Sequence, residues 1–191
     1  MNKLNQKEQT IALKGARQAL KNLFNDTSNT ISEFAPLNQY PPKETFVTLK
    51  KGNELRGCIG TRTGKSLAET IITATKLSAT EDSRFQPIQP EEVSHLTIEI
   101  SVLNDPEPIS FENFNAFLKS DDFQLGRDGL MIESESGRKA LFLPQVGEEI
   151  PNKAQFYGYL CDKAGIGFNQ CIDMTQMRLQ KFTADVFSEK K

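Results

Sequence analysis

The stretch Thr45–Ile59, TFVTLKKGNELRGCI, predicts a β-hairpin and sets the fold class. Side chains alternate over its first seven residues, with Val47 and Leu49 on one face, and a period of two is typical of a strand. Gly52-Asn53 follows as a two-residue turn, after which the chain returns through a second strand. The sequence therefore predicts a sheet that begins with an antiparallel pair.

Further strands are predicted on the C-terminal side of the hairpin. Residues His95–Leu103, HLTIEISVL, alternate along their length, with Leu96 and three β-branched residues on one face and Glu99 on the other. Two prolines within Asn104–Pro108 predict a turn. Weaker strand candidates lie at 123–126, 129–134 and 139–143, and residues 178–187 alternate as one final strand.

Four helices are predicted from the spacing of apolar residues. Residues 5–24 place leucines and alanines on one helical face. A second helix begins at Ser66, where Ser66 and Glu69 fit a capping box, and ends near Ala79. The others are a short helix within 111–122 and a helix that Asn152 caps and Gly165 ends.

Helices and strands alternate along the chain, and the hairpin favours antiparallel pairing. The sequence therefore predicts an α+β fold, with a largely antiparallel sheet packed with helices. The 191 residues suit a single domain over 1–191. Residues 25–43, which are polar and proline-rich, are predicted to form a connecting loop with a short turn near 31–34.

Composition and charge limit the classes of function. The chain carries 23 basic and 25 acidic residues, a net charge of −2, whereas a protein that binds nucleic acid over its whole surface is usually much more basic. No apolar run approaches the ~20 residues of a membrane span, and the N-terminus lacks the apolar region of a signal peptide. We therefore expect a cytoplasmic protein without a membrane segment.

The few cysteines and the single histidine limit metal and disulfide chemistry. Cys58, Cys161 and Cys171 are an odd number, lie far apart and form no C-x-x-C pair, so neither a zinc ribbon nor a disulfide framework is indicated. His95 is the only histidine, which excludes a polyhistidine site. We expect no metal site, and Cys161, spaced with apolar neighbours on its helix, is interpreted as a core residue.

A cationic segment lies within residues 50–65. It holds five basic residues and one acidic residue, a local charge of +4 on an acidic chain. Such a patch favours a small anionic ligand or an acidic partner surface, although charges that point from a hairpin into water are an equal alternative. Amides near the helix start at Ser66 add a weak anion site. The modest charge and the lack of interleaved aromatic residues argue against nucleic-acid binding.

Cys58 is the conspicuous candidate nucleophile within this segment. Gly57 and Gly60 flank it, and glycines let a backbone approach a ligand closely. At an ordinary pKa of about 8.5 only a few per cent of a thiol is ionised at neutral pH, but Arg56 or a helix N-terminus would lower that pKa. The alternative is a small buried thiol that packs beside the glycines.

The hexapeptide Leu55–Gly60, LRGCIG, resembles the signature of the AMME syndrome candidate gene 1 protein family. Residues Asp82–Pro87, DSRFQP, are similar to the family's D-x-R-F-x-P element, and the likeness continues through LPQV at 143–146 and LCDKAG at 160–165. It covers residues 10–187 in the family's order. Members usually carry two tryptophans in the C-terminal part, and this chain has no tryptophan.

The resemblance implies an α+β fold of two unequal lobes, with both ends of the chain in the larger lobe and the hexapeptide near the cleft between the lobes. It also implies partners, because family members often occur beside a Memo-like protein and a radical SAM enzyme in the AmmeMemoRadiSam system. The candidate ligand-binding residues are Arg56, Gly57, Ile59, Gly60, Arg84, Phe85 and Glu99, and the candidate catalytic residue is Cys58.

Three functions follow as hypotheses. The first is an accessory protein that binds a small anionic ligand or a partner at the hexapeptide. The second is an enzyme that uses Cys58 in group transfer, with Arg56 and loop amides stabilising negative charge. The third is nucleic-acid binding through the 50–65 patch. Arg84 would either bind an anion bidentately or pair with Asp82 or Glu99, and Glu99 is also a candidate general base.

Overall fold

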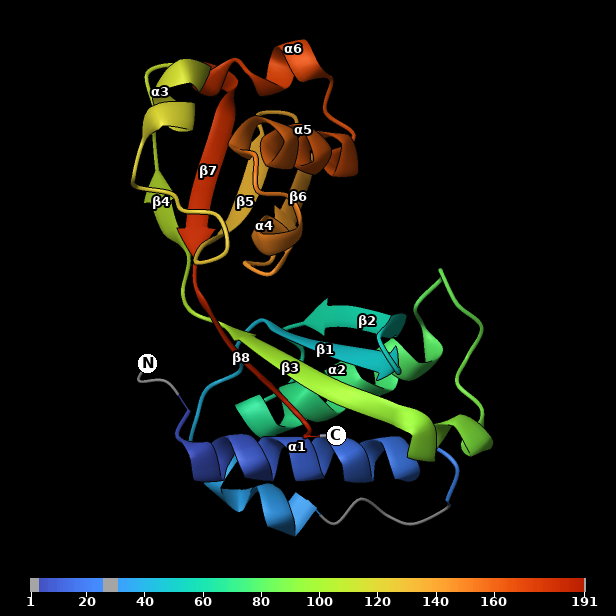
Figure 1. The fold of residues 1–191 in the computed structure, drawn as a ribbon. Coiled ribbons are helices and arrows are strands. Elements are labelled where there is room, and N and C mark those ends of the chain that lie inside the picture. Colours follow the sequence, from blue (N-terminus) through green and yellow to red (C-terminus); the bar gives the residue numbers. More distant parts are fainter. Residues whose placement is uncertain (1–3, 26–30, 191) are drawn as a thin grey trace. The chain divides into compact units, whose positions relative to one another are not determined.

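The computed structural model describes residues 4–25 and 31–190, and these divide into two compact units (Figure 1). The first unit contains the residues up to Leu103 together with those from Asp185 onward, and the second contains Asn104–Ala184. Each unit has its own antiparallel sheet and its own apolar core. The predicted α+β fold with antiparallel pairing is confirmed.

The sheet of the first unit is built around the predicted hairpin. Its strands are β1 (Thr45–Lys51), β2 (Glu54–Thr61), β3 (Leu96–Leu103) and β8 (Ala184–Ser188), in the order β2-β1-β3-β8. Strand β1 pairs antiparallel with both β2 and β3, and Thr48 lies opposite Cys58 on one side and opposite Glu99 on the other. The register therefore places these three residues in one row across the sheet.

Helices cover one face of this sheet (Figure 1). They are α1 (Gln6–Lys21) and α2 (Leu67–Thr80), with the 3-10 turns η1 (Ile31–Leu37) and η2 (Pro90–His95) beside them. Val47 and Leu49 of β1 and Ile98 of β3 are fully buried in the core of this unit. The alternation that predicted the strands is thus the alternation between the core and the opposite face, and residues 48, 58 and 99 lie on the opposite face.

The second unit packs a second sheet against helices. Its strands run in the order β4-β7-β5-β6: β4 (Glu107–Ile109), β5 (Gly129–Ser134), β6 (Lys139–Phe142) and β7 (Met177–Phe182). Its helices are α3 (Phe114–Lys119), α4 (Val146–Glu149), α5 (Lys153–Ala164) and α6 (Phe168–Cys171), followed by the 3-10 turn η3 (Met174–Gln176). Phe117, Phe123 and Tyr157 form the centre of its core. Asn152 caps α5 and Gly165 ends it in the left-handed conformation, as predicted.

Two strand predictions and one turn prediction were wrong. Residues 178–187 form β7 and β8, which belong to different sheets, because alternation shows a strand but not its partners. Residues 123–126 form a turn, in which the Asp128 carboxylate accepts a hydrogen bond from the Gln124 amide. The predicted turn at 104–108 contains the start of β4, a short edge strand, and an edge tolerates its proline.

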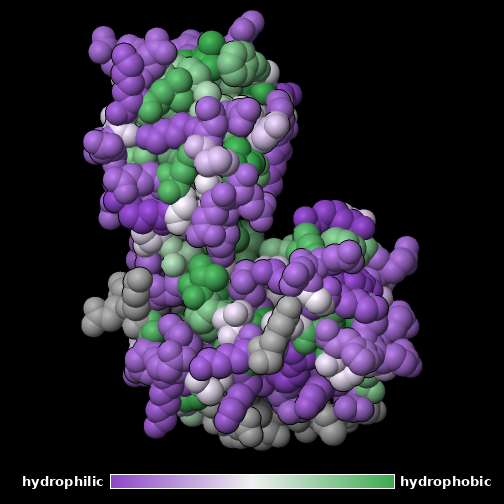
Figure 2. Space-filling view, in the orientation of Figure 1, coloured by the Kyte–Doolittle hydropathy of each residue, from purple (hydrophilic) through white to green (hydrophobic). Residues whose placement is uncertain are grey.

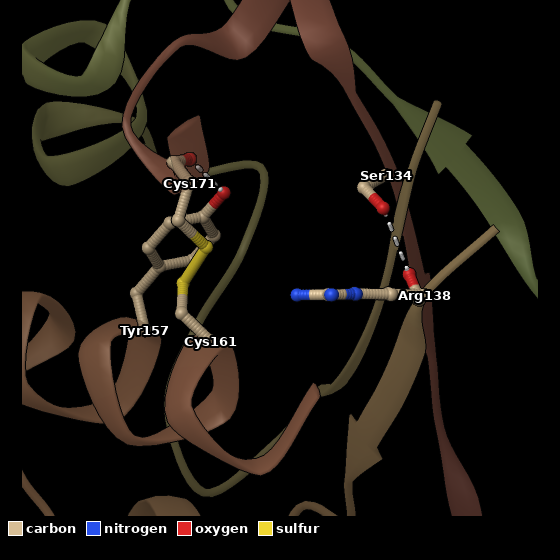
Figure 3. The surroundings of a disulfide bond; sticks show 5 residues. All are labelled: Ser134, Arg138, Tyr157, Cys161 and Cys171. Carbon is tan, nitrogen blue, oxygen red and sulfur yellow. Dashed lines mark hydrogen bonds between the residues drawn. A yellow bond between two sulfur atoms is a disulfide. The ribbon is translucent and has the colours of Figure 1, made fainter. Parts of the chain in front are cut away.

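The expectation that the cysteines form no disulfide was also wrong. Cys161 and Cys171 are joined, with their Cα atoms 6.2 Å apart (Figure 3). The chain reverses after α5 at Gly165, which brings α6 back alongside and closes a short loop. Such a single pair has no spacing signature, so counting cysteines could not reveal it. Cys161 is 1% exposed, as predicted for a core residue.

Polar and charged residues cover most of the face of each unit that Figure 2 shows. Apolar residues form small areas between them. Within residues 4–25 and 31–190, no helix is long and apolar enough to cross a lipid bilayer.

Candidate functional site

Two segments singled out in the sequence, 55–60 and 82–87, lie against each other in the first unit. The Cys58 amide donates a hydrogen bond to Asp82 Oδ2 at 2.8 Å, and Arg84 Nη2 donates to the Cys58 carbonyl at 3.2 Å. Strand β2 is at the edge of its sheet, so these two side chains occupy backbone groups that a neighbouring strand would otherwise use.

The two glycines of the hexapeptide permit close packing. A Cβ atom at Gly57 would lie 2.1 Å from the Ser78 carbonyl oxygen of α2, and one at Gly60 would lie 2.4 Å from the ring of Phe46. Neither space admits a side chain. Their role in this structure is the approach of helix and ring to β2.

Ser78 of α2 holds the backbone of Ile59 in β2 through a hydrogen bond. Its hydroxyl donates to the Val47 carbonyl at 2.7 Å and accepts from the Ile59 amide at 2.8 Å. The hydroxyl therefore bridges β1 and β2 from the helix that packs on them. No sequence signal indicated this bridge.

Arg56 is bound to η2 and the loop before it. Its Nε and Nη2 atoms each lie 2.9 Å from a Glu92 carboxylate oxygen, and Nη1 donates to the Gln86 carbonyl at 2.9 Å. The Arg56 guanidinium holds the pKa of Glu92 at about 2. Both side chains are less than one-fifth exposed. Arg56 is therefore already paired with a carboxylate.

Arg84 pairs with Asp82, which settles the alternative with Glu99. Arg84 Nε and Nη2 donate to the carboxylate at 2.9 and 2.7 Å, and this holds the pKa of Asp82 at about 2. The Asp82 side chain is 6% exposed, whereas that of Arg84 is 55% exposed. The Phe85 ring lies 5.6 Å from the Arg84 guanidinium carbon and 6.0 Å from that of Arg56. An exposed cation thus rests on a buried carboxylate and an aromatic ring.

Cys58 has a free, partly exposed thiol that is not activated. Burial raises the pKa of this thiol above its ordinary value, with smaller opposing contributions from a Thr48 hydrogen bond and from Arg84. Thr48 Oγ1 donates to Sγ at 3.3 Å, and the charges of Asp82 and Glu99 raise the pKa further. His95 is the only histidine that could take the proton of this thiol. Within the described residues, no hydrogen bond joins the two.

Glu99 pairs with Lys50 across the sheet at 3.0 Å. Both line a surface pocket of about 480 Å³ in the first unit. The other lining residues are Gly52, Asn53, Thr97, Ser188 and Glu189. Because Glu99 is separated from Cys58 by Thr48 in the register, it is not placed to take the thiol proton directly.

The anion site predicted at the start of α2 is occupied by the protein itself. The Leu67 amide donates to the Tyr40 carbonyl at 3.0 Å, and the Glu69 amide donates to Ser66 Oγ at 3.3 Å. The Glu69 carboxylate accepts from the Lys65 amide at 2.8 Å, so only the serine half of the predicted capping box forms. A carboxylate already lies where an anion would bind, and this prediction was wrong.

The unpaired positive charge of the cationic segment 50–65 is smaller in the fold than its sequence suggests. Lys50 and Arg56 are neutralised by Glu99 and Glu92, which lie far away in the sequence. The cations Lys51, Arg62 and Lys65 remain exposed. Within the described ranges, no cluster of three or more His, Cys, Asp and Glu residues is arranged to hold a metal ion.

Sequence reasoning missed the groups that fix the hexapeptide in place. Thr48, Ser78 and Glu92 were not candidates, and they act through contacts made by the fold. Asp82 was named only within the resemblance and as one possible partner of Arg84. The location of the hexapeptide near a cleft between lobes stays a prediction.

Comparisons with known proteins agree with the fold. The AMMECR1 family model matches residues 13–187. The protein Ta0236 of Thermoplasma acidophilum is 38% identical over 159 residues, which is 82% of this chain and 70% of that protein. MK0488 of Methanopyrus kandleri is 32% identical over 195 residues, which is 99% of this chain and 92% of that protein.

A solved structure is also similar. The crystal structure of the uncharacterized protein PH0010 from Pyrococcus horikoshii matches with a TM-score of 0.86 and 31% identity, over 99% of this chain and 95% of that one. The printed names of these relatives state no activity. The family match covers most of the chain and agrees with the identity to these relatives, so this chain belongs to the AMMECR1 family.

Proposed function

We propose that this chain is an accessory binding component, and that the Arg84 guanidinium receives an acidic group of its ligand or partner. The observation that carries the proposal is the exposure of Arg84: its side chain is 55% exposed, while the carboxylate that orients it is 6% exposed. Asp82 and the Cys58 carbonyl take the Nε and Nη2 donors, so Nη1 is the group of this fixed, ring-backed guanidinium that donates to a carboxylate or phosphate oxygen of the ligand.

The surroundings of Arg84 support recognition of an acidic group. Phe85 lies against its guanidinium, and Cys58 holds Nη2 through its carbonyl. The paired Asp82 reduces the net charge, so binding depends on the direction of the hydrogen bonds more than on long-range attraction. The family resemblance makes a Memo-like protein and a radical SAM enzyme the partners to test.

The alternative of a Cys58 nucleophile finds less support. An oxyanion site needs free donors, and the Cys58 and Ile59 amides are bonded to Asp82 and Ser78. Arg56 is bonded to Glu92. The raised pKa of the thiol lowers its thiolate fraction at neutral pH. Each group that the enzyme hypothesis requires is engaged elsewhere or is not activated.

Nucleic-acid binding through residues 50–65 also loses support. Two of its five cations are paired within the fold. Affinity for a phosphate backbone depends on unpaired cations and falls steeply with salt. Retention on RNA at 50 mM salt that is lost at 200 mM would favour this alternative.

The proposal is tested with Arg84→Lys, which keeps the charge and removes the planar fork. Arg62→Lys is the matched control, because Arg62 is exposed and donates a single long bond to the Pro42 carbonyl. Binding to the Memo-like protein and the radical SAM enzyme of the same organism is measured by biolayer interferometry. Titrations with acetate and inorganic phosphate are followed through the Arg84 Nε–H resonance.

We expect Arg84→Lys to weaken binding by about tenfold or more, equal to about 1.4 kcal/mol, and Arg62→Lys to leave it unchanged. A response to acetate or phosphate alone would identify a small ligand, and a response to a protein alone would identify a partner. Equal affinities for both variants and the unmodified chain would reject Arg84 as the binding group.

A further inference from the structure

The Cys161–Cys171 disulfide connects α5 to the segment formed by residues 165–176, called here the α6 segment. The two cysteines are ten residues apart in sequence, and each is at most 1% exposed. The segment leads directly into β7, an inner strand of the second sheet. The bond therefore fixes the part of the chain that enters the centre of the second unit.

Non-covalent contacts hold the same segment. Tyr157 donates its hydroxyl proton to the Cys171 carbonyl at 2.8 Å, and the Ile166 amide donates to the Cys161 carbonyl at 3.0 Å. Ile166 is 2% exposed. Because free cysteines are among the most buried residue types, two thiols at these positions remain compatible with the packed core. The segment therefore has a defined place with the bond or without it.

The α6 helix is weak by itself. It contains four residues, and Gly167 at its start provides no side-chain hydrogen bond to cap it. Phe168 is 57% exposed and adds little burial. Single-turn helices are unstable without tertiary contacts, so loss of the covalent bond should leave this helix in its place but more prone to local opening.

Arg138 lies at the same helix ends. Its side chain extends toward them in Figure 3, and Nη1 donates to the carbonyl of Gly165, four residues after Cys161. This hydrogen bond ties residue 165 of the α6 segment to the loop between β5 and β6, so it must break when the segment opens.

We propose that the Cys161–Cys171 bond is a reversible redox latch that controls local opening of the α6 segment. A small dithiol is the reductant. One of its thiolates attacks a sulfur of the pair, and the other cysteine leaves as a thiolate. The second dithiol sulfur then displaces the first cysteine, so the reductant becomes a cyclic disulfide and two protons and two electrons end on Cys161 and Cys171. A small disulfide reverses the step.

The burial of both cysteines gates this reaction. A reductant reaches the sulfurs only when the α6 segment opens, and the reduced segment opens more often because a loop constraint has been removed. Reduction is therefore slow while the α6 segment is closed and faster once the segment opens. The second unit stays folded in both states.

The test uses the intact full-length chain. It is equilibrated with dithiothreitol or with oxidised glutathione, and the thiols are counted by peptide-resolved alkylation. Hydrogen exchange is then measured by mass spectrometry in both states. We expect complete and reversible reduction, at least tenfold faster exchange in peptides of 165–176, and unchanged exchange in β5. The Cys161→Ser, Cys171→Ser double variant should reproduce the reduced pattern and ignore dithiothreitol.

Three results would overturn the proposal. Equal exchange in both states would mean that the bond controls nothing, and resistance to excess dithiol would mean that it is not reversible. Faster exchange throughout the second unit would mean that the bond is a staple for the whole unit. If the double variant fails to fold, hydrogen exchange of the oxidised and the reduced unmodified chain still tests the proposal.

Discussion

Asp82 accepts hydrogen bonds from the Cys58 amide and from Arg84, and it is buried while Arg84 is exposed. One carboxylate thus fixes the backbone at the candidate nucleophile and orients the candidate anion-binding group. This assigns Asp82 a positioning role. The sequence leaves open whether Arg84 binds an anion or pairs with Asp82 or Glu99, and the fold shows the pair with Asp82.

The pH dependence of stability tests this role. The pKa of Asp82 falls from 3.8 to about 2 on folding, chiefly through Arg84. A lowered pKa stabilises the fold at pH values above 3.8, and that stabilisation, at most about 2 kcal/mol, is lost as the pH falls toward 2. Replacing Asp82 by Asn removes this component.

The free energy of unfolding is therefore measured by urea titration at pH 5 and pH 2. The difference between the unmodified chain and Asp82→Asn should shrink by up to about 2 kcal/mol at the lower pH. Asp121→Asn, at an exposed position, controls for the loss of a charge. A difference that stays constant with pH would show that Asp82 is not stabilised by its partners.

The hexapeptide lies in strand β2, and helix α2 packs against this strand. The sequence predicted both elements because alternation and capping are local signals. It did not predict that Ser78 bridges two strands or that Gly57 meets the Ser78 carbonyl. Those contacts depend on how the helix crosses the sheet, and local spacing does not carry that information. The same limit explains why alternation alone predicts one strand over residues 178–187.

Gly57→Ala should destabilise the packing of α2 on β2. Its Cβ would lie 2.1 Å from a backbone carbonyl, which cannot rotate away. Overpacking of this kind typically costs about 1–3 kcal/mol. Gly158→Ala is the control, because that glycine lies within α5 with open space around it, and alanine there should stabilise by up to about 1 kcal/mol. Thermal unfolding compares the two, and equal stability of both variants would contradict the close contact.

The whole chain consists of two units that each have a sheet and a core. The antiparallel α+β class could be predicted, since hairpin and helix signals are strong along the chain. The disulfide could not, because it depends on the reversal of the chain after α5. The role of the hexapeptide is ambiguous in the sequence, and the internal contacts of the Cys58 amide and of Arg56 reduce the support for nucleophilic catalysis.

The second unit should fold by itself. Its aromatic core, centred on Phe117 and Tyr157, lies entirely within residues 104–184. Units with their own core generally fold independently. A fragment of these residues should therefore give a cooperative thermal transition and dispersed amide resonances. A fragment without either property would show that its core depends on the remainder of the chain.

We propose that the hexapeptide is part of a binding surface and that its thiol is not a catalytic nucleophile. The most direct measurement is the pH dependence of alkylation at Cys58, which in the oxidised chain is the only free cysteine. We predict slow labelling that titrates above the ordinary cysteine pKa of about 8.5, because burial raises the pKa of this thiol. Fast labelling that titrates well below that value would contradict the account and restore the nucleophile.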